Sequence, residues 1–354
     1  MPTEIVGGIL SAPPVGDTAD DRRAAHFLPD PRARTIDPSH IRWEARQDEH
    51  DGFDRSLIHI YSSWADPWLI ATHAATATTT TGLTVAHRPG VTSPTVAARA
   101  FATLDNLSGG RAATHIVVGS SDADVRRDGD YLDKNARYQR AHEYLELFTR
   151  TLTAEEPFDY HGRFYQVHDS WAGFRPLQSP HPPISIGGSS LPAKELAAQF
   201  AYAYAGTFPT LDAARTTTTE VRALARSHQR NLRFWKQFFV ILGDTDSDAT
   251  ATATALRERG KQLLDTRSAE SLRSSAQIAR SSERELQHIA DIRHAAHQHL
   301  DNTFANLVIG SVERTADHIA AYRRAGIDIL QIVALTETDD DRKLRARLVT
   351  ELHR

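Results

Sequence analysis

Two consecutive glycines followed by two serines form the segment of this chain best suited to hold a phosphate. Gly187 and Gly188 end a short apolar run. Ser189 and Ser190 follow, just before a helical pattern that begins near Pro192. Glycines let a ligand approach the backbone closely, and serine hydroxyls beside the free N–H groups of a helix N-terminus suit a phosphate. A strand-to-helix turn with a serine cap accounts for the same residues, so both interpretations stay open.

Other nucleotide-binding signatures are missing from the sequence. No G-x-G-x-x-G follows a predicted strand, and no G-x-x-x-x-G-K-[ST] occurs. The glycines therefore do not indicate a dinucleotide site or a P-loop, and a mononucleotide phosphate fits the diglycine turn better.

Histidines are the side chains best placed for acid–base or cofactor contacts. His115 lies within a β-type run, where it could face a barrel interior and contact a cofactor or substrate, or be a hydrogen-bonded core residue. His26 and His59 lie in early runs that we interpret as strands, and they could face the same interior. The cluster at 294–299 resembles exposed helix more than a metal site, because no carboxylate stands at a convincing third-ligand spacing. No metal is expected.

Composition excludes several functional classes. The chain has 354 residues, of which 40% are hydrophobic and 24% charged, so it can bury a substantial core. A net charge of −4 gives no reason to expect a nucleic-acid or anionic-membrane partner. The absence of cysteine excludes disulfides, a thiol nucleophile and thiolate metal ligands. We find no apolar stretch of about 18 residues and no signal-peptide pattern, so we expect a cytoplasmic protein.

Alternating strand and helix patterns position these residues. Runs at Leu83–Val85 and Ala113–Val118 bracket a helical stretch at about 93–107, which is a βαβ unit. Similar alternation continues along the chain, and about eight strands can be counted. This pattern favours an α/β fold of the (β/α)8 TIM-barrel type, in which the site lies at the carboxyl ends of the strands.

Domain organisation follows from the same pattern. Residues 1–20 are rich in glycine, proline and alanine, and we interpret them as a flexible arm. Residues 21–354 are predicted to form a single barrel domain. The segment 244–300 is polar and has no strong strand signal, so we expect a helical insertion near the barrel mouth that covers the site as a lid.

Four separated segments resemble one known family. RPGVTSPTVAARAFATLDNLSGGRA, RDGDYLDKNARY, YHGRFYQV and PHPPISIGGSSLPAKELAA occur in the order and with the spacing of the alkanesulfonate monooxygenase branch of the bacterial luciferase-like flavin monooxygenases. The resemblance covers most of residues 25–245 and resumes around GSVERTADHIAAYRRAGIDIL. It implies a TIM barrel that binds reduced FMN and uses molecular oxygen as co-substrate, activated as a flavin C4a-hydroperoxide. It also implies a separate NAD(P)H-dependent flavin reductase as partner, a small-molecule substrate, and a homodimer or homotetramer.

The resemblance also implies cofactor ligands. The family's phosphate site matches the turn from Gly187 to Ser190, and the tyrosine of its R-Y pair matches Tyr138. Ser120, after the fourth strand, is a further cofactor-binding candidate. Arg88 belongs to the family's R-P pair, and it could face flavin or substrate or hold the loop through a salt bridge.

Departures from the family pattern bear on the substrate. Trp64 stands where the family has a cysteine, and Gln237 and Phe239 stand where it has an arginine and a histidine. Arginine binds a sulfonate best through paired, charge-assisted hydrogen bonds, so a simple alkanesulfonate is not the expected substrate. With His115 and His26, these three residues are the predicted substrate-pocket set. An F420-dependent oxidoreductase of the same barrel superfamily and a non-catalytic flavin-binding protein remain alternatives.

Overall fold

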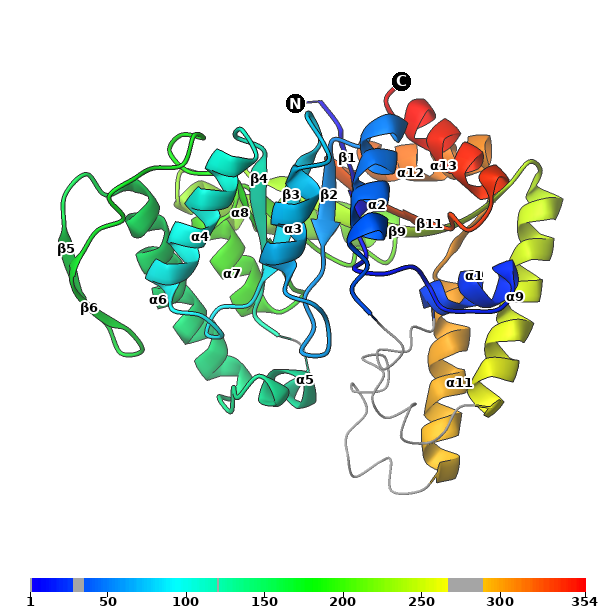
Figure 1. Ribbon diagram of the computed structural model, residues 1–354, viewed down its shortest axis with the longest axis horizontal. Helices are drawn as coiled ribbons and strands as arrows, with labels where there is room; N and C mark the ends of the chain where they lie inside the picture. Colours follow the sequence, from blue (N-terminus) through cyan, green and yellow to red (C-terminus); the bar gives the residue numbers. More distant parts are fainter. Residues whose placement is uncertain (1, 28–34, 120, 267–288) are drawn as a thin grey trace.

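Eight parallel strands close into a barrel in the computed structural model, which describes residues 2–27, 35–119, 121–266 and 289–354 (Figure 1). The ring runs in the order β1, β2, β3, β4, β7, β8, β9 and β11, and β11 pairs with β1 to close it. The strands are β1 (Glu4–Gly8), β2 (Arg55–Ile58), β3 (Gly82–His87), β4 (Ala112–Val117), β7 (Ile184–Gly187), β8 (Ala203–Ala205), β9 (Arg233–Gly243) and β11 (Ile329–Ala334). The predicted (β/α)8 TIM barrel is confirmed.

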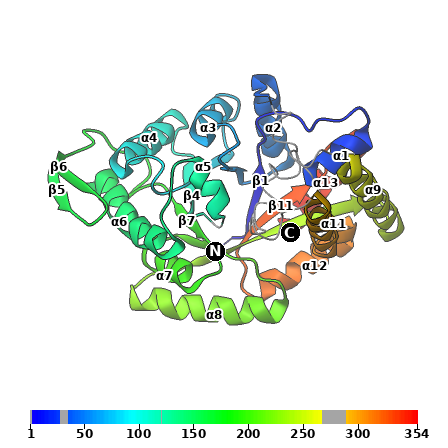
Figure 2. The same cartoon turned by 90° about the horizontal axis from the view of Figure 1, so that it is seen from below.

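Helices surround this barrel on its outer face (Figure 2). They are α2 (Pro38–Asp51), α3 (Pro67–Ala75), α4 (Pro94–Leu107), α6 (Lys134–Thr153), α7 (Leu191–Phe200), α8 (Leu211–Ser227), α12 (Val312–Arg324) and α13 (Asp339–Leu352). The shorter α1 (Ala19–Phe27) and α5 (Asp122–Arg127) and the pair α9 (Asp246–Thr266) and α11 (Ile289–Ala305) lie at the end of the barrel where the strands finish. Among the described residues, no helix is long and apolar enough to cross a membrane.

The expected flexible arm is wrong for residues 4–8, because they form the first barrel strand. Ile5 and Val6 are both fully buried, so β1 is covered on its inner and outer faces. Its register runs from Glu4 opposite Ile329 to Val6 opposite Arg55. Gly7 is required at this point because a Cβ there would lie 2.3 Å from the Asp48 carboxylate on α2. The glycines that suggested a tail instead let a helix pack against a strand.

The strand expected to begin at His26 is also wrong. His26 and Phe27 end helix α1, while residues 28–34 lie outside the described part of the chain.

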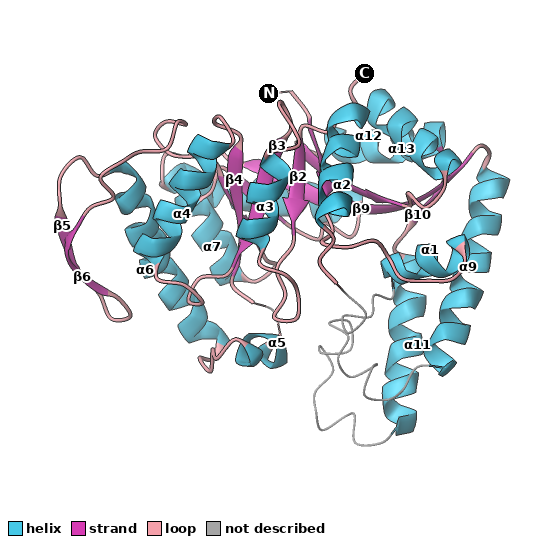
Figure 3. Ribbon diagram, viewed as in Figure 1, coloured by secondary structure: helices cyan, strands magenta, loops and turns pink. Residues whose placement is uncertain are grey.

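Two further elements lie outside the ring. The antiparallel hairpin β5 (Phe158–His161) and β6 (Gln166–Ser170) projects from one side of the molecule (Figure 3). Strand β10 (Val308–Ser311) pairs with the last residues of β9, beyond the stretch of β9 that pairs with β8.

The segment predicted as an insertion forms α9 and α11 in its described parts. These helices run side by side next to the barrel mouth (Figure 1). Leu256 of α9 and Leu300 of α11 are both 1% exposed and pack with Ile241 of β9 and with Leu335. The pair therefore shares a small hydrophobic core with the barrel wall, and its role as a mobile cover stays a prediction.

Candidate functional site

A cavity of about 1550 Å³ opens at the carboxyl ends of the barrel strands. Its walls include residues at or just after the ends of five strands, namely Gly8, His59, Gly119, Gly188 and Thr336, together with Phe239 from within β9. Helices α6, α11 and α12 contribute further lining, including Lys134, Thr303 and His318. This is the end of a TIM barrel at which active sites lie, so we take the cavity as the candidate site.

The predicted phosphate turn forms one wall of the cavity. Gly188 has φ +148°, and a Cβ on it would lie 2.7 Å from Ala193 of α7 and 3.2 Å from the Tyr138 hydroxyl. Ser190 is the N-cap residue of α7, yet its side chain makes no cap hydrogen bond. Its hydroxyl is buried without a hydrogen-bond partner among the described residues. An unpaired buried hydroxyl beside a helix N-terminus is what a phosphate oxygen would satisfy.

Helix α6 presents two polar side chains to the same wall. Tyr138 and Lys134 both line the cavity, and they are four residues apart, which places them on one face of the helix. The Tyr138 hydroxyl lies at the edge of the turn, near Gly188. The Tyr138 hydroxyl, the Lys134 ammonium and the Ser190 hydroxyl thus line one cavity, and all three are groups that bind a phosphate.

The floor of the cavity is formed by side chains that point into the barrel. His115 Nδ1 lies 2.9 Å from the Ser185 hydroxyl, and its ring centroid lies 5.2 Å from that of Trp235. Trp235 in turn donates its indole N–H to the side-chain oxygen of Gln331 at 3.2 Å. Gly187 leaves room for His115, because a Cβ there would come within 2.8 Å of Nε2. His115 lines the cavity and bonds Ser185, and its role toward a cofactor or substrate stays a prediction.

The two interior histidines are uncharged at neutral pH. Burial lowers the pKa of His59 to about 4. Burial, and to a lesser extent the proximity of His59, lowers the pKa of His115 to about 4. Desolvation penalises the imidazolium form, and no carboxylate of the described residues counters it at either histidine. Both rings can therefore donate or accept hydrogen bonds, but neither supplies a positive charge for an anion.

Three residues of the predicted substrate pocket line the cavity. Phe239 is 38% exposed although it belongs to a barrel strand, and it lies at the mouth. Gln237 lies two residues deeper on the same face of β9 and stands opposite Gln331 in the register. Trp64 follows β2, and its ring packs on Tyr61 at 4.8 Å and edge-on to His59 at 6.2 Å. Aromatic surface therefore dominates this side of the opening.

Arg88 forms a salt bridge, which is the structural one of its two predicted roles. Its guanidinium is 3% exposed and pairs with Asp124 and Asp128 of the α5 region, at 2.5 Å each. Asp124 also accepts the Ser62 hydroxyl at 2.7 Å. Arg88 thus ties β3 to the α5 segment and to the loop after β2. It still lines the cavity, but its two terminal nitrogens are engaged by carboxylates.

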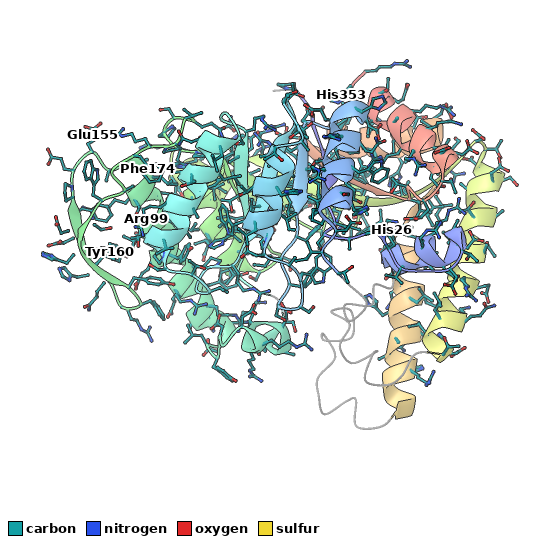
Figure 4. The ribbon with its side chains drawn as sticks, in the orientation of Figure 1. His26, Arg99, Glu155, Tyr160, Phe174 and His353 are labelled. Carbon is teal, nitrogen blue, oxygen red and sulfur yellow. The ribbon has the colours of Figure 1, made fainter. Side chains whose placement is uncertain are left out.

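His26 lines the cavity from α1 and not from a barrel strand (Figure 4). Its Nε2 lies 2.8 Å from Glu337, in the segment between β11 and α13. Arg22, one turn earlier, contacts the same carboxylate at 3.0 Å. The side chain therefore fixes α1 against the barrel rim, which is a correction to its expected place in the barrel interior. Ser120 lies outside the described residues.

Sequence reasoning missed several cavity residues. Gln331 lies inside a predicted strand, where strand alternation alone does not say which face is inward. A polar residue in an otherwise apolar strand, such as Gln331 in IDILQIVAL, is the signal that was available. Lys134 could have been found from its spacing of four residues from Tyr138.

Comparisons with known proteins agree with this architecture. The sequence profile of the luciferase-like monooxygenase family matches residues 23–328. EDTA monooxygenase from Chelativorans sp. BNC1 superimposes with a TM-score of 0.74 at 18% identity, covering 99% of this chain and 93% of that one. The oxygenating constituent of 3,6-diketocamphane monooxygenase from Pseudomonas putida, in complex with FMN, gives 0.66 at 17% identity, with 99% and 97% covered.

A third similar structure uses another cofactor. Coenzyme F420-dependent tetrahydromethanopterin reductase from Methanopyrus kandleri superimposes with a TM-score of 0.71 at 15% identity, covering 99% of both chains. At these identities the structural likeness establishes the fold alone. The family assignment comes from the sequence profile.

Proposed function

The chain belongs to the luciferase-like monooxygenase family, a class of flavin-dependent enzymes, and we propose that it is the oxygenating component of a two-component system that uses reduced FMN. A separate NAD(P)H-dependent flavin reductase would supply the reduced cofactor. The substrate would be a small or medium organic molecule other than a simple alkanesulfonate. As in other flavin enzymes, the cofactor would supply the electrons that activate oxygen.

The buried, unpaired hydroxyl of Ser190 carries this proposal. It lies at the start of α7 beside a diglycine turn that lines the cavity, and it has no hydrogen-bond partner among the described residues. With Tyr138 and Lys134 it makes a donor set that matches a mononucleotide phosphate. Ser189, which is exposed, would complete the set from the same turn.

The protein's own residues would then orient the cofactor and exclude water. The phosphate end would be held at the turn, which lines the same cavity as His115 and Trp235. These aromatic and uncharged groups would keep strong acids away from the reacting atoms. The histidines stay neutral above about pH 5, which limits stray protonation near the reacting atoms.

Cofactor titration tests the proposal. Replacing Ser190→Ala should weaken the binding of reduced FMN about tenfold, because a hydrogen bond to a charged group contributes roughly 1.5–3 kcal/mol. Anaerobic fluorescence titration measures the affinity. Ser227→Ala is the matched control, since that hydroxyl bonds the Leu224 carbonyl on exposed α8. Equal affinity of both variants for reduced FMN would show that this turn does not bind the phosphate. Binding of F420 without binding of FMN would favour the F420-dependent alternative.

Alkanesulfonates should be poor substrates. Gln237 and Phe239 bring no positive charge to the mouth, and Arg88 is engaged by two aspartates. The protein, a flavin reductase, FMN and NADH should therefore release little sulfite from a series of alkanesulfonates, measured with a thiol-reactive dye. Robust release from several of them would show that anion recognition resides elsewhere, for example at Lys236.

Oligomeric state is a further part of the proposal. The family resemblance predicts a homodimer or homotetramer, and light scattering of the purified protein measures it. A mass equal to the chain's 39.3 kDa would contradict the prediction.

A further inference from the structure

A tryptophan and a glutamine fix each other at the floor of the cavity. Trp235 Nε1 lies 3.2 Å from Gln331 Oε1. An indole nitrogen can only donate, so the glutamine oxygen must be the group that faces it. The amide nitrogen of Gln331 is thereby turned away from Trp235 and cannot exchange places with the oxygen without losing this bond.

That amide nitrogen is an unused donor. Gln331 is 4% exposed, and its Nε2 is buried with no hydrogen-bond partner among the described residues. The residue nevertheless lines the cavity. An unpaired buried amide costs free energy, and a ligand that accepts from it would recover that cost.

The described side chains that form the floor beside this donor carry no charge. His59 and His115 are neutral at pH 7, because burial lowers the pKa of each to about 4. Gln237, opposite Gln331 on the neighbouring strand, is an uncharged amide. Trp235 and Phe239 add aromatic surface. A charged ligand placed here would lose its hydration without gaining an ion pair. An apolar ligand with one hydrogen-bond acceptor would lose little hydration free energy.

We infer that the floor recognises an uncharged substrate with an apolar body and a single hydrogen-bond acceptor of the carbonyl type, and that the Gln331 amide donates to that acceptor. The inference rests on the proposed function, since it assigns the phosphate turn to the cofactor and the floor to the substrate. Gln331 is thus a specificity-determining residue. The amide of Gln331 donates a hydrogen bond to the acceptor, and Trp235 sets the orientation of that amide.

Three probes of similar size separate the contributions of shape, acceptor and charge. Acetophenone has a carbonyl acceptor, ethylbenzene lacks one, and benzenesulfonate is an anion. Their affinities are measured by saturation-transfer NMR on the whole protein loaded with reduced FMN under anaerobic conditions. We expect acetophenone to bind about fivefold more tightly than ethylbenzene, the effect of one hydrogen bond to a neutral acceptor. Benzenesulfonate should bind most weakly.

Variants assign the preference to Gln331. Gln331→Met keeps the length of the side chain and removes the donor, so it should abolish the preference for acetophenone over ethylbenzene. Gln237→Met removes the other amide that lines this part of the cavity, and the preference should survive in this variant if Gln331 is the donor. Trp235→Phe leaves Gln331 in place but removes the hydrogen bond that orients it. This variant should therefore reduce the ratio of the affinity for acetophenone to the affinity for ethylbenzene.

The outcomes distinguish this inference from the proposed function. The affinity for reduced FMN is titrated in each variant alongside the probes. If Gln331→Met weakens FMN binding, the amide serves the cofactor and the substrate assignment is overturned. If the preference for acetophenone survives in Gln331→Met, or disappears only in Gln237→Met, the Gln331 amide is not the donor to the substrate acceptor. Failure of the wild-type protein to bind reduced FMN at all would instead refute the proposed function.

Discussion

A buried histidine behind the barrel wall couples stability to pH. His87 is 3% exposed, accepts the Trp68 indole N–H at 3.3 Å through Nδ1 and lies 2.6 Å from the Tyr144 hydroxyl through Nε2. Burial lowers its pKa to about 4, below the value of about 6.5 expected in the unfolded chain. Its contribution to stability is therefore complete above about pH 6.5 and is lost as the pH falls toward 4, because the unfolded state then binds the proton that the folded state excludes.

We predict that His87→Gln, which cannot titrate, lacks this dependence. The free energy of unfolding of the wild type should fall relative to the variant by about 2 kcal/mol between about pH 7 and about pH 5. Urea unfolding of both proteins at the two pH values measures the difference. The comparison is needed because burial raises the pKa of Asp48 to about 7, an effect of opposite sign that both proteins share. A constant difference across this range would show that His87 does not titrate as its burial indicates.

Individual site residues were predictable where a backbone motif marks them. The diglycine turn was found from its residues and Tyr138 from the family resemblance; both line the cavity, and their binding of a phosphate stays a prediction. Arg88 could not be assigned, because its role depends on Asp124 and Asp128, which lie 36 and 40 residues further along the chain. His26 was misplaced because a short apolar run next to a proline fits a strand end as well as a helix end.

Elements with strong periodicity were predicted closely, and short ones were not. The helix expected at about 93–107 is Pro94–Leu107, and the strand expected at Ala113–Val118 is Ala112–Val117. Strand β1 was missed because five residues containing two glycines carry no period that distinguishes a strand from a tail. Its burial comes from the neighbours β2 and β11, and these contacts between distant parts of the chain are not visible in a local pattern.

Helices α9 and α11 are predicted to open as a unit separate from the barrel. Leu300 is 1% exposed in a small core that includes Phe304 and Leu335. Leu300→Ala should cost about 2–4 kcal/mol and should raise amide hydrogen exchange in α9 and α11, while exchange in β3 and β4 stays as in the wild type. Leu107→Ala, at a position 65% exposed, is the control. Equal loss of protection throughout the barrel would show that the two helices unfold with it and do not act as a separate cover.

Closure of the barrel depends on an ion-pair network at the amino ends of its strands. The Glu4 carboxylate contacts Arg55 at 2.7 Å and Arg233 at 2.6 Å, and it accepts the Tyr202 hydroxyl at 3.0 Å. These side chains come from β1, β2, β9 and the residue that precedes β8. One carboxylate from the first strand thus joins strands contributed by the beginning and the later part of the chain, and it fills the end of the barrel opposite the cavity.

Removing this carboxylate should destabilise the whole molecule. In Glu4→Ala, two partly buried guanidinium groups lose their partner, and breaking a buried pair in this way costs about 3 kcal/mol or more. Differential scanning calorimetry should show a lower melting temperature for the entire cooperative transition, because the first strand contributes to ring closure. Glu351→Ala is the control, since Glu351 pairs only with the terminal Arg354 among the described residues, at a surface site. A melting temperature equal to that of the wild type would mean that the ion pairs of Glu4 add little to the closure of the barrel.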